Sequence, residues 1–342
     1  KTSVAIDASA VTSVTGTHAE LMSLYAAGTA GTITGLGNEA ITANDAAGIT
    51  VSQANDLAAK TTGALTATLS NTALADYATL EGTGNAYTIS IADAAIDADA
   101  LQALNAKTTV NINLTLDTSI SGTLANVNAI VAETGVTNVN DTIAVTITDT
   151  ITAAQAETLV GTNVGNVTAT IAADAAATIN GALSGAADGN DNLSITITDT
   201  AGVASVLNTL DSRTATDIDV SSLISVTGTN ADIATLYGNT ANFVGLGNEN
   251  ITPTDANLTV AQVNTLRGFT TGTVTETVSN MALGVTTVNA ALTNAGVDAL
   301  TMVVDVADAT MTKAELQDLL ELDGKTSVAI DASAVTSVTG TH

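Results

Sequence analysis

Residues 142–161 read TIAVTITDTITAAQAETLVG, and this stretch decides the fold class. In its first half Ile143, Val145 and Ile147 alternate with Ala and Thr, which is the period of a β-strand with one apolar face. Its second half, AAQAETLV, is made of good helix formers with few β-branched residues. The stretch therefore predicts a strand that is followed by a helix.

The same two patterns recur along the chain. Other alternating aliphatic runs that lead into Asp or Asn are ALTATLSNT (64–72), AYTISIADA (86–94), NINLTLDT (111–118), NVTATIAAD (166–174), NLSITITDT (192–200), TVTETVSNM (273–281) and MVVDVADA (302–309). Segments with helical spacing are VSQANDLAAK (51–60), DADALQALNAK (97–107), VASVLNTLD (203–211), VAQVNTLRG (260–268) and KAELQDLLEL (313–322). In the last of these, Leu316, Leu319 and Leu320 form one apolar stripe.

If each strand is followed by a helix that leads to the next strand, neighbouring strands must pair in parallel. Such a strand–helix–strand connection is a crossover, and crossovers are right-handed in nearly all known cases. We therefore predict an α/β fold, a right-handed solenoid with one parallel sheet and about twelve strand-plus-helix coils of about 27 residues in each period. A parallel β-helix, with the Ala-rich stretches as strands, is the alternative. The helix formers of DALQALNA (99–106) weigh against it.

The chain also repeats at longer range. The segment 1–18, KTSVAIDASAVTSVTGTH, recurs without change at 325–342, so the sequence offset is 325 − 1 = 324. We interpret 1–324 as one full tandem repeat unit and 325–342 as the start of the next identical repeat, so a parent protein is expected to continue in at least one direction. An added terminal duplication is the alternative.

A more diverged repeat lies inside that period. SVTGT recurs at 13–17 and 225–229, GLGNE recurs at 35–39 and 245–249, and Gln53 with Leu57 recurs as Gln262 with Leu266. The sequence offset thus drifts from 225 − 13 = 212 to 262 − 53 = 209. Loops on one face of a solenoid tolerate such small insertions.

Composition excludes several classes of protein. A net charge of −27 leaves no basic surface for nucleic acid or for an anionic membrane. Aromatic residues are only 2%, too few for a broad globular core, whereas 45% hydrophobic residues are too many for a disordered chain. The chain has no Cys for a disulfide or a thiolate zinc site, and no apolar run approaches the length of a membrane span.

Asp or Asn stands near the end of most predicted strands. These residues are Asn38, Asn71, Asp93, Asp117, Asp149, Asp199, Asn248, Asn280 and Asp308. Such side chains cap exposed backbone N–H groups at strand-to-helix turns. Stacking would also place them in a row about 4.8 Å apart, where adjacent carboxylates repel each other unless a cation such as calcium intervenes. Both interpretations stay open, and the candidate calcium ligands are Asp93, Asp117, Asp149, Asp199 and Asp308.

Thr pairs are expected on the outward face of the strands. They are Thr66/Thr68, Thr146/Thr148, Thr168/Thr170, Thr196/Thr198 and Thr275/Thr277. Thr suits a solvated sheet face, and a flat TxT lattice also resembles the surface of some solenoid ice-binding proteins. Asp7, Asn111, Asn113 and Asp305 interrupt the pattern. Glu276 occupies an inward-facing place that the pattern does not explain.

Catalysis finds little support in the sequence. His18 and His342 are the same repeat position, expected in a surface turn, so no second His and no Cys can complete a nucleophile–base pair or a transition-metal site. GLGN at 35–38 and 245–248 lacks the third Gly and the Lys of a phosphate loop and predicts turns. We therefore do not expect an enzyme, and calcium is the only cofactor considered.

Three units resemble the repeats of giant secreted bacterial cell-surface proteins, which form S-layer-like coats, adhesins and surface filaments. They are residues 51–72, 151–174 and 260–280. The resemblance implies an extracellular or cell-surface location, type I secretion, rigidification by calcium and a mechanical role.

From the repeats and this resemblance we predict a structural repeat module of an extracellular filament or surface layer. Its partners would be adjacent copies of the same repeat, in the same chain or in neighbouring filaments, with no nucleic acid and no membrane span. One alternative is an adhesin stalk that presents a distal binding domain. The other is a solenoid that binds ice or glycan with its Thr-rich face.

Overall fold

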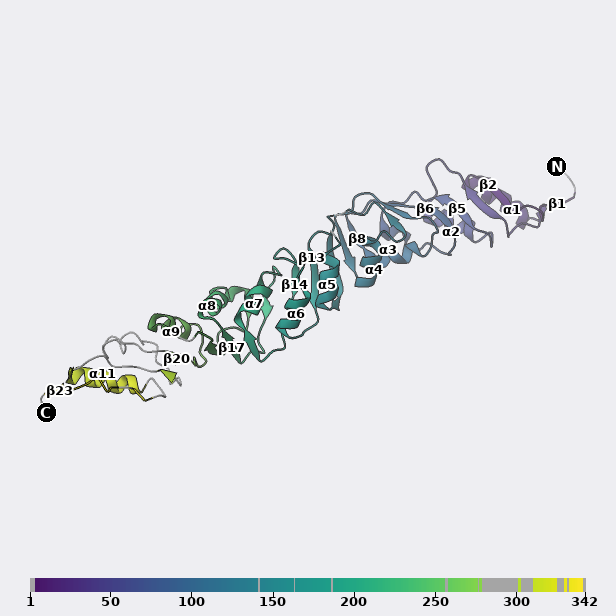
Figure 1. The fold of residues 1–342 in the computed structure, drawn as a ribbon. Helices are drawn as coiled ribbons and strands as arrows, with labels where there is room; N and C mark the ends of the chain where they lie inside the picture. Colours follow the sequence, from purple (N-terminus) through teal and green to yellow (C-terminus); the bar gives the residue numbers. More distant parts are fainter. Residues whose placement is uncertain are drawn as a thin grey trace. The chain divides into compact units, whose positions relative to one another are not determined.

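The computed structural model describes residues 4–340 apart from 141, 163, 186, 256–257, 276, 279–300, 303–309, 325–328 and 331. The chain divides into two compact units. Figure 1 shows the helices and strands, coloured along the sequence. Unit 1 comprises residues 1–151 and 158–170, and unit 2 comprises residues 152–157 and 171–342. Glu276, Asn280, Asp305, Asp308 and His342 lie outside the described residues, so the expectations that rest on them stay open.

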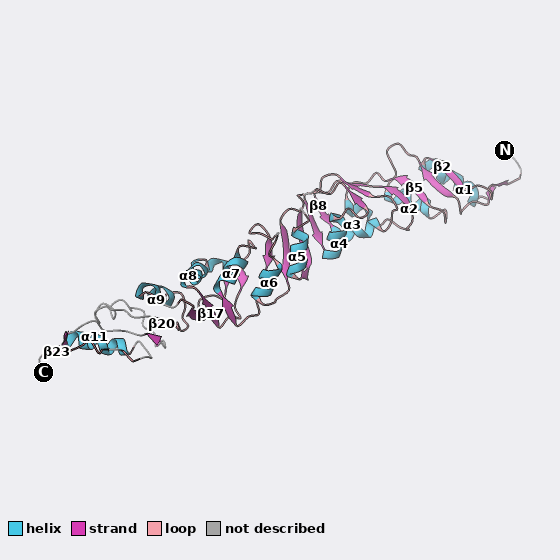
Figure 2. Cartoon of the chain, in the orientation of Figure 1, coloured by secondary structure: helices cyan, strands magenta, loops and turns pink. Residues whose placement is uncertain are grey.

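Short strands and short helices alternate in unit 1 (Figure 2). The strands are β1 (Ile6–Asp7), β2 (Ser13–Gly16), β3 (Ile33–Thr34), β4 (Ala40–Ala43), β5 (Leu65–Thr68), β6 (Ala86–Thr88), β7 (Ser90–Ile91), β8 (Ala95–Asp97), β9 (Ile112–Leu114), β10 (Ser119–Gly122), β11 (Val136–Thr137), β12 (Ala144–Ile151) and β13 (Val167–Ile171). The helices are α1 (His18–Thr29), α2 (Val51–Ala58), the 3₁₀ turn η1 (Leu74–Tyr77), α3 (Ala98–Asn105) and α4 (Leu124–Val131). Helix α5 (Ala153–Val160) contains residues of both units, and so does β13, since Ile171 belongs to unit 2.

Unit 2 continues the alternation. Its strands are β14 (Asn192–Ser194), β15 (Ala201–Val203), β16 (Ile218–Asp219), β17 (Ser225–Gly228), β18 (Phe243–Val244), β19 (Asn250–Pro253), β20 (Thr277–Val278), β21 (Thr301–Met302), β22 (Thr310–Thr312) and β23 (Ser337–Thr339). Its helices are α6 (Ala176–Ala182), α7 (Ala204–Asp211), α8 (Asn230–Gly238), the 3₁₀ turn η2 (Thr240–Asn242), α9 (Val260–Arg267) and α11 (Lys313–Asp323). The Ala-rich stretches are therefore helices, and the parallel β-helix alternative is wrong for these segments.

Parallel pairing between coils confirms the predicted strand–helix–strand repeat. In unit 1, Ser119 of β10 lies opposite Ala144 of β12, so the sequence offset is 144 − 119 = 25. The offset is smallest between Thr66 of β5 and Ala86 of β6, at 86 − 66 = 20. It is largest between β1 and β3, at 33 − 6 = 27, and between β2 and β4, at 40 − 13 = 27. One coil is therefore 20 to 27 residues long in this unit, at or below the length of about 27 residues predicted from the sequence.

The prediction of one parallel sheet needs correction, because the strands form several parallel sheets. In unit 1, β7, β9 and β11 pair in one sheet, and β8, β10 and β12 pair in another. Each coil there contributes two short strands separated by a bend, such as residues 115–118 between β9 and β10. Each strand pairs with the corresponding strands of the neighbouring coils, as β9 does with β7 and β11.

The core lies between the strands and one face of each helix. Ile143, Val145 and Ile147 are buried, as predicted, while Ala144 and Thr146 between them are exposed. The short helices bury residues at i, i+3 and i+6, for example Ala98, Leu101 and Leu104 in α3. Buried stripes of this spacing lie on one side of a helix, and burial of each Leu is worth about 1.5–3 kcal/mol. In α11 the predicted stripe is only partly buried, because Leu320 is 73% exposed.

The internal sequence repeat is also a structural repeat. The order β1, β2, α1 in unit 1 is the same as the order β16, β17, α8 in unit 2. The strands β2 and β17 have the same sequence, SVTG. β2 pairs with β4 as β17 pairs with β19. The same coil is therefore built twice within one period.

Candidate functional site: the contacts between neighbouring coils

The Asp and Asn residues near the strand ends hold neighbouring coils together. The side chain of Asp149 accepts a hydrogen bond from the backbone N–H of Leu124, the first residue of α4, at 2.8 Å. Helix α4 belongs to the preceding coil, 149 − 124 = 25 residues earlier. The sequence pattern predicts capping at strand-to-helix turns, and the capped helix proves to be the one before the strand. We call such a contact an inter-coil cap.

Among the described residues, six helix starts carry an inter-coil cap, and one of these helices is the 3₁₀ turn η1. The pairs, acceptor first, are Asp45 with His18, Asn71 with Val51, Asp93 with Leu74, Asp149 with Leu124, Asp199 with Ala176, and Asp255 with Asn230. The first N–H groups of a helix lack an intrahelical acceptor. In α2 the hydroxyl of Thr50 satisfies the N–H of Gln53, while Asn71 of the next coil satisfies that of Val51. The two kinds of cap are complementary, and most inter-coil caps place a carboxylate at the positive end of a helix.

These positions bear directly on the predicted calcium ligands. Asp93, Asp149 and Asp199 act as inter-coil caps, and the buried Asp117 accepts from the backbone N–H of Asn140 at 2.9 Å. Among the described residues no three acidic or His side chains come close enough to hold a metal ion together. Calcium takes six to eight oxygen ligands, so the described carboxylates do not fit a shared calcium site. Calcium binding stays a prediction, and Asp308 lies outside the described residues.

The Thr pairs point outward, as predicted. Every described member of these pairs is exposed, from Thr66 to Thr275. Across the β2, β4 and β5 strands, Thr15, Thr42 and Thr66 lie opposite one another, but the next position on β6 is Ala86. In the neighbouring sheet the corresponding row contains Asp97, Ser121 and Thr146. The Thr rows are therefore short in these sheets, and binding of ice or glycan is not tested by the geometry.

A buried Tyr–Glu pair occurs twice and was not singled out by the sequence analysis. In unit 2 the hydroxyl of Tyr237 donates to the carboxylate of Glu249 at 2.9 Å, and the backbone N–H of Gly247 donates to the same oxygen at 2.9 Å. Glu249 is 0% exposed. In unit 1 Tyr25 donates to Glu39, which also accepts from Gly37 at 2.8 Å. The recurrence of GLGNE together with an upstream Tyr was the signal that could have revealed the pair.

The electrostatics of this pair are those of a structural carboxylate. Burial alone would raise the pKa of Glu39, but hydrogen bonds from Tyr25, Gly37 and Asn38 outweigh it and hold the pKa below its ordinary value. Burial and the adjacent Glu39 raise the pKa of Tyr25. The glycines of GLGNE adopt positive φ, +82° at Gly35 and +123° at Gly37, and so build a tight turn that directs backbone N–H groups at the carboxylate. The turn prediction for GLGN is confirmed.

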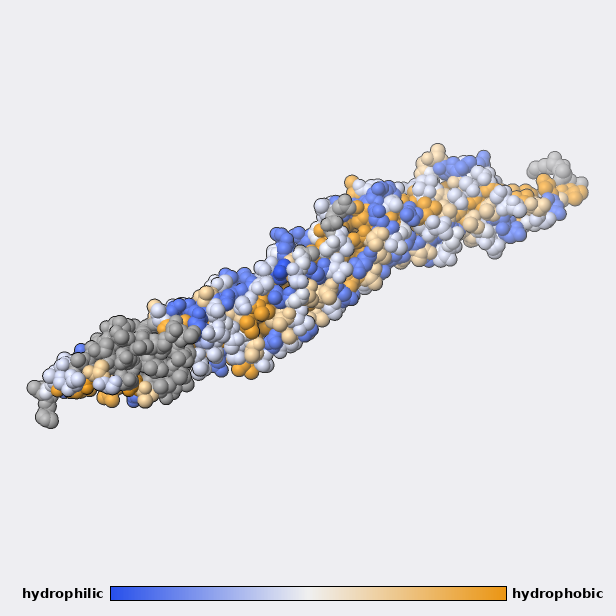
Figure 3. Space-filling view, in the orientation of Figure 1, coloured by the Kyte–Doolittle hydropathy of each residue, from blue (hydrophilic) through white to orange (hydrophobic). Residues whose placement is uncertain are grey.

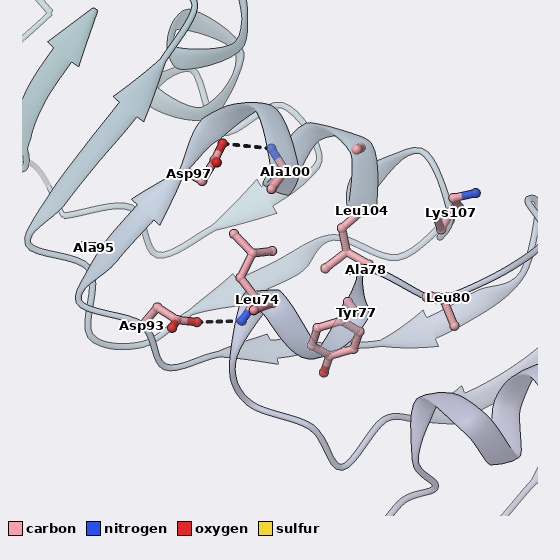
Figure 4. Close-up of a pocket in the computed structure, with 12 residues that line it drawn as sticks. Leu74, Tyr77, Ala78, Leu80, Asp93, Ala95, Asp97, Ala100, Leu104 and Lys107 are labelled. Atoms are coloured by element: carbon pink, nitrogen blue, oxygen red, sulfur yellow. Dashed lines mark hydrogen bonds between the residues drawn. The ribbon is translucent and has the colours of Figure 1, made fainter. Parts of the chain in front are cut away.

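An apolar groove lies where unit 1 replaces a full helix by η1 (Figure 4). Its volume is about 520 Å³, and Leu74, Tyr77 and Leu80 from the η1 coil face Leu104 of α3 across it. Asp93 and Asp97 lie at one side, and each already accepts a backbone hydrogen bond, drawn as a dashed line. Burial raises the pKa of Tyr77 to about 12. No His or Cys lines the groove, and its polar lining consists of Tyr77, Asp93, Asp97 and Lys107.

His18, expected in a surface turn, is the first residue of α1 and is half-buried. Its backbone N–H donates to Asp45, and its Nδ1 lies 3.4 Å from the side-chain amide of Gln53. The helix starts there because Thr17 and Glu20 form a reciprocal capping box. The described residues therefore place His18 in the packing between coils.

Comparison with protein-family models, with curated proteins and with solved structures found no match for this chain. No helix in the described part of the chain is both long and apolar enough to cross a membrane.

Proposed function

We propose that the chain is a structural repeat module of an extracellular filament or surface layer. In this proposal the coils stack as a continuous right-handed α/β solenoid, with about twelve coils in each repeat unit 1–324, and successive copies join without a linker. The role is mechanical, and the module is not an enzyme. The extracellular location rests on the resemblance to secreted surface repeats.

The pairing of β22 with β23 is the observation that carries the proposal. Thr310, Met311 and Thr312 lie opposite Ser337, Val338 and Thr339. The residues of β23 repeat Ser13, Val14 and Thr15 of β2. Their sequence offset from β22 is 337 − 310 = 27, the same as that between β2 and β4. The start of a second copy thus joins the first copy by the pairing that joins coils within a copy.

Two further features support a mechanical role. Each coil depends on its neighbour, through parallel strand pairing and through inter-coil caps such as that between Asp149 and Leu124. The net charge of −27 would keep polymers of this chain soluble and mutually repelling.

Negative-stain microscopy of chains with one, two and four tandem copies tests the proposal. We expect uniform rods whose length grows in proportion to the number of copies. Separate globular particles joined by flexible linkers would contradict continuous stacking. A knob at one tip of longer native chains would favour the adhesin stalk instead.

A further inference from the structure

The long sequence period contains three related segments. The pattern S-x-x-G-T stands at 13–17, 119–123 and 225–229, so the sequence offset is 119 − 13 = 225 − 119 = 106. In each segment the Thr that ends the pattern is the N-cap of the following helix, which is α1, α4 or α8. Residues at the same distance from this Thr therefore occupy equivalent places in the segments, which we call the first, middle and last segments.

The last segment fills one such place with two stacked aromatic rings. Tyr237 lies 237 − 229 = 8 residues after its N-cap and is 5% exposed. Its ring stacks on that of Phe269, which follows α9, with the ring centroids 5.2 Å apart. Its hydroxyl donates to Glu249. In the first segment Tyr25 stands at the same place and donates to Glu39.

The middle segment has neither ring. Val131 occupies the tyrosine place, since 131 − 123 = 8. Helix α5 follows α4 as α9 follows α8, and Thr162 lies 162 − 159 = 3 residues after the buried Leu159 of α5. Phe269 likewise lies 269 − 266 = 3 residues after the buried Leu266 of α9. Thr162 therefore occupies the phenylalanine place.

The glutamate place is changed as well. A Cβ added to Gly272 would meet the carbonyl oxygen of Glu249 at 2.4 Å. A Cβ added to Gly165 would meet the carbonyl oxygen of Thr142 at 2.5 Å in the same way. These close approaches identify Thr142 as the residue that stands where the last segment has its buried carboxylate.

A pocket of about 260 Å³ lies where the middle segment has the smaller residues, and we call it the ring pocket. Val131 and Thr162, at the two ring places, both line it. Its other apolar lining includes Val139, Val164 and the fully buried Ile143. Thr162 is exposed and Val131 is half-buried, so the pocket is open to solvent. Pockets for drug-sized ligands span about 300–1,000 Å³, so the ring pocket suits a single ring.

Surface hydropathy alone would not single out this pocket. Figure 3 shows hydrophobic residues scattered among hydrophilic ones on the face that it draws. What distinguishes the ring pocket is its equivalence to a place that two rings fill in the last segment.

We propose that the ring pocket binds a phenol, a small planar aromatic molecule that carries a hydrogen-bond donor. The ring would lie against Val139, Ile143 and Val164, in the place that Tyr237 and Phe269 fill in the last segment. This binding goes beyond the mechanical role in the proposed function and does not depend on it.

Glu133 supplies the polar contact that favours a donor. It lines the pocket, and its Oε1 accepts from the backbone N–H of Val139 at 3.3 Å. A carboxylate has about four acceptor sites, so the group can also accept from a phenol hydroxyl. An aromatic carboxylate should bind less well, because Glu133 and the net charge of −27 both repel an anion.

Fluorine NMR of para-fluorophenol titrated with the unmodified full chain tests the ligand class. We expect saturable binding, weaker binding of para-fluorobenzoate, and no displacement of the phenol by cyclohexanol, which has a hydroxyl but no planar ring. In Glu133→Gln the preference for the phenol over the benzoate should narrow. Absence of saturable binding, equal competition by cyclohexanol or an unchanged preference in Glu133→Gln would overturn the proposal.

Matched phenylalanine variants test the place. Val131→Phe fills the pocket from α4, and Phe is used because Thr142 stands where the last segment has the acceptor for a Tyr hydroxyl. This variant should abolish saturable binding and raise the urea concentration at the unfolding midpoint, as filling a cavity does. Thr162→Phe, at an exposed residue, should also abolish binding and decides the question if Val131→Phe does not fold. Thr146→Phe adds the same ring at an exposed strand position and should leave binding unchanged. Binding that survives in the folded pocket variants, or that is lost in Thr146→Phe, would contradict the assignment.

Discussion

The same isoleucine in the two copies of one coil gives a direct measure of what stacking contributes. Ile218 of β16 is 0% exposed and Ile6 of β1 is 57% exposed. Truncation of a fully buried Ile to Ala costs about 2–5 kcal/mol, from lost burial and from the cavity left behind. A largely exposed side chain changes stability by about 0.5 kcal/mol or less. We therefore expect Ile218→Ala to cost at least about 1.5 kcal/mol more than Ile6→Ala.

Urea unfolding followed by far-UV circular dichroism measures this difference, at protein concentrations where the chain is monomeric. The slope of the unfolding free energy against urea should stay the same in both variants, because a changed slope would indicate that the cooperative unit has changed. Equal losses for the two variants would refute the reasoning that a preceding coil covers Ile218. So would a loss below about 1 kcal/mol for Ile218→Ala.

Three further predictions concern the caps, the buried carboxylate and calcium. Asp149→Ala removes the acceptor for the N–H of Leu124 and should lower the free energy of unfolding in urea by about 1 kcal/mol. Asp149→Asn keeps an acceptor and should lower it by less. Equal losses in the two variants would argue against a hydrogen-bonded cap. The pKa of Glu39 is held below its ordinary value of 4.5, so its carboxylate stabilises the fold above that pH and loses this effect as pH falls through the lowered pKa. The stability difference between the unmodified chain and Glu39→Gln should narrow from about pH 7 to about pH 3, and a constant difference would contradict the hydrogen-bonded carboxylate. If the predicted Asp ligands hold calcium, excess EGTA should lower the melting temperature by many degrees, whereas an unchanged melting temperature would leave capping as the role of these carboxylates.

The sequence predicted the repeating strand and helix because those patterns are local. Alternation in 142–150 places Ile143, Val145 and Ile147 on one face whatever the tertiary fold, and the helix formers of 97–107 give α3 in the same way. The sequence did not reveal the second strand of each coil. Strands as short as β7 and β11 cannot show alternation.

The contacts between coils were the harder part to predict. Asp149 and Leu124 are 149 − 124 = 25 residues apart, and a capping rule that considers only adjacent residues misses the pair. In the sequence Glu39 looks like a polar residue in a surface turn. In the structure it is buried, because Tyr25 and the turn built by the two positive-φ glycines donate hydrogen bonds to its carboxylate. The exposure of Leu320 could not be predicted from the sequence either. Helical spacing shows that Leu316, Leu319 and Leu320 lie on one face of the helix, but it does not show whether another element covers that face.

The distance between Ser13 and Ser337 is the most direct test of continuous stacking, because these residues occupy the same position in successive copies. Both are exposed, so nitroxide labels on Ser13→Cys and Ser337→Cys can be measured by double electron–electron resonance. Dilution of the labelled chain with unlabelled chain suppresses signals between chains. About twelve coils at the strand spacing of about 4.8 Å give about 58 Å for a straight solenoid, and curvature would shorten it. We predict a narrow distribution at or somewhat below that value, whereas a broad distribution or one centred above about 80 Å would contradict the continuous solenoid.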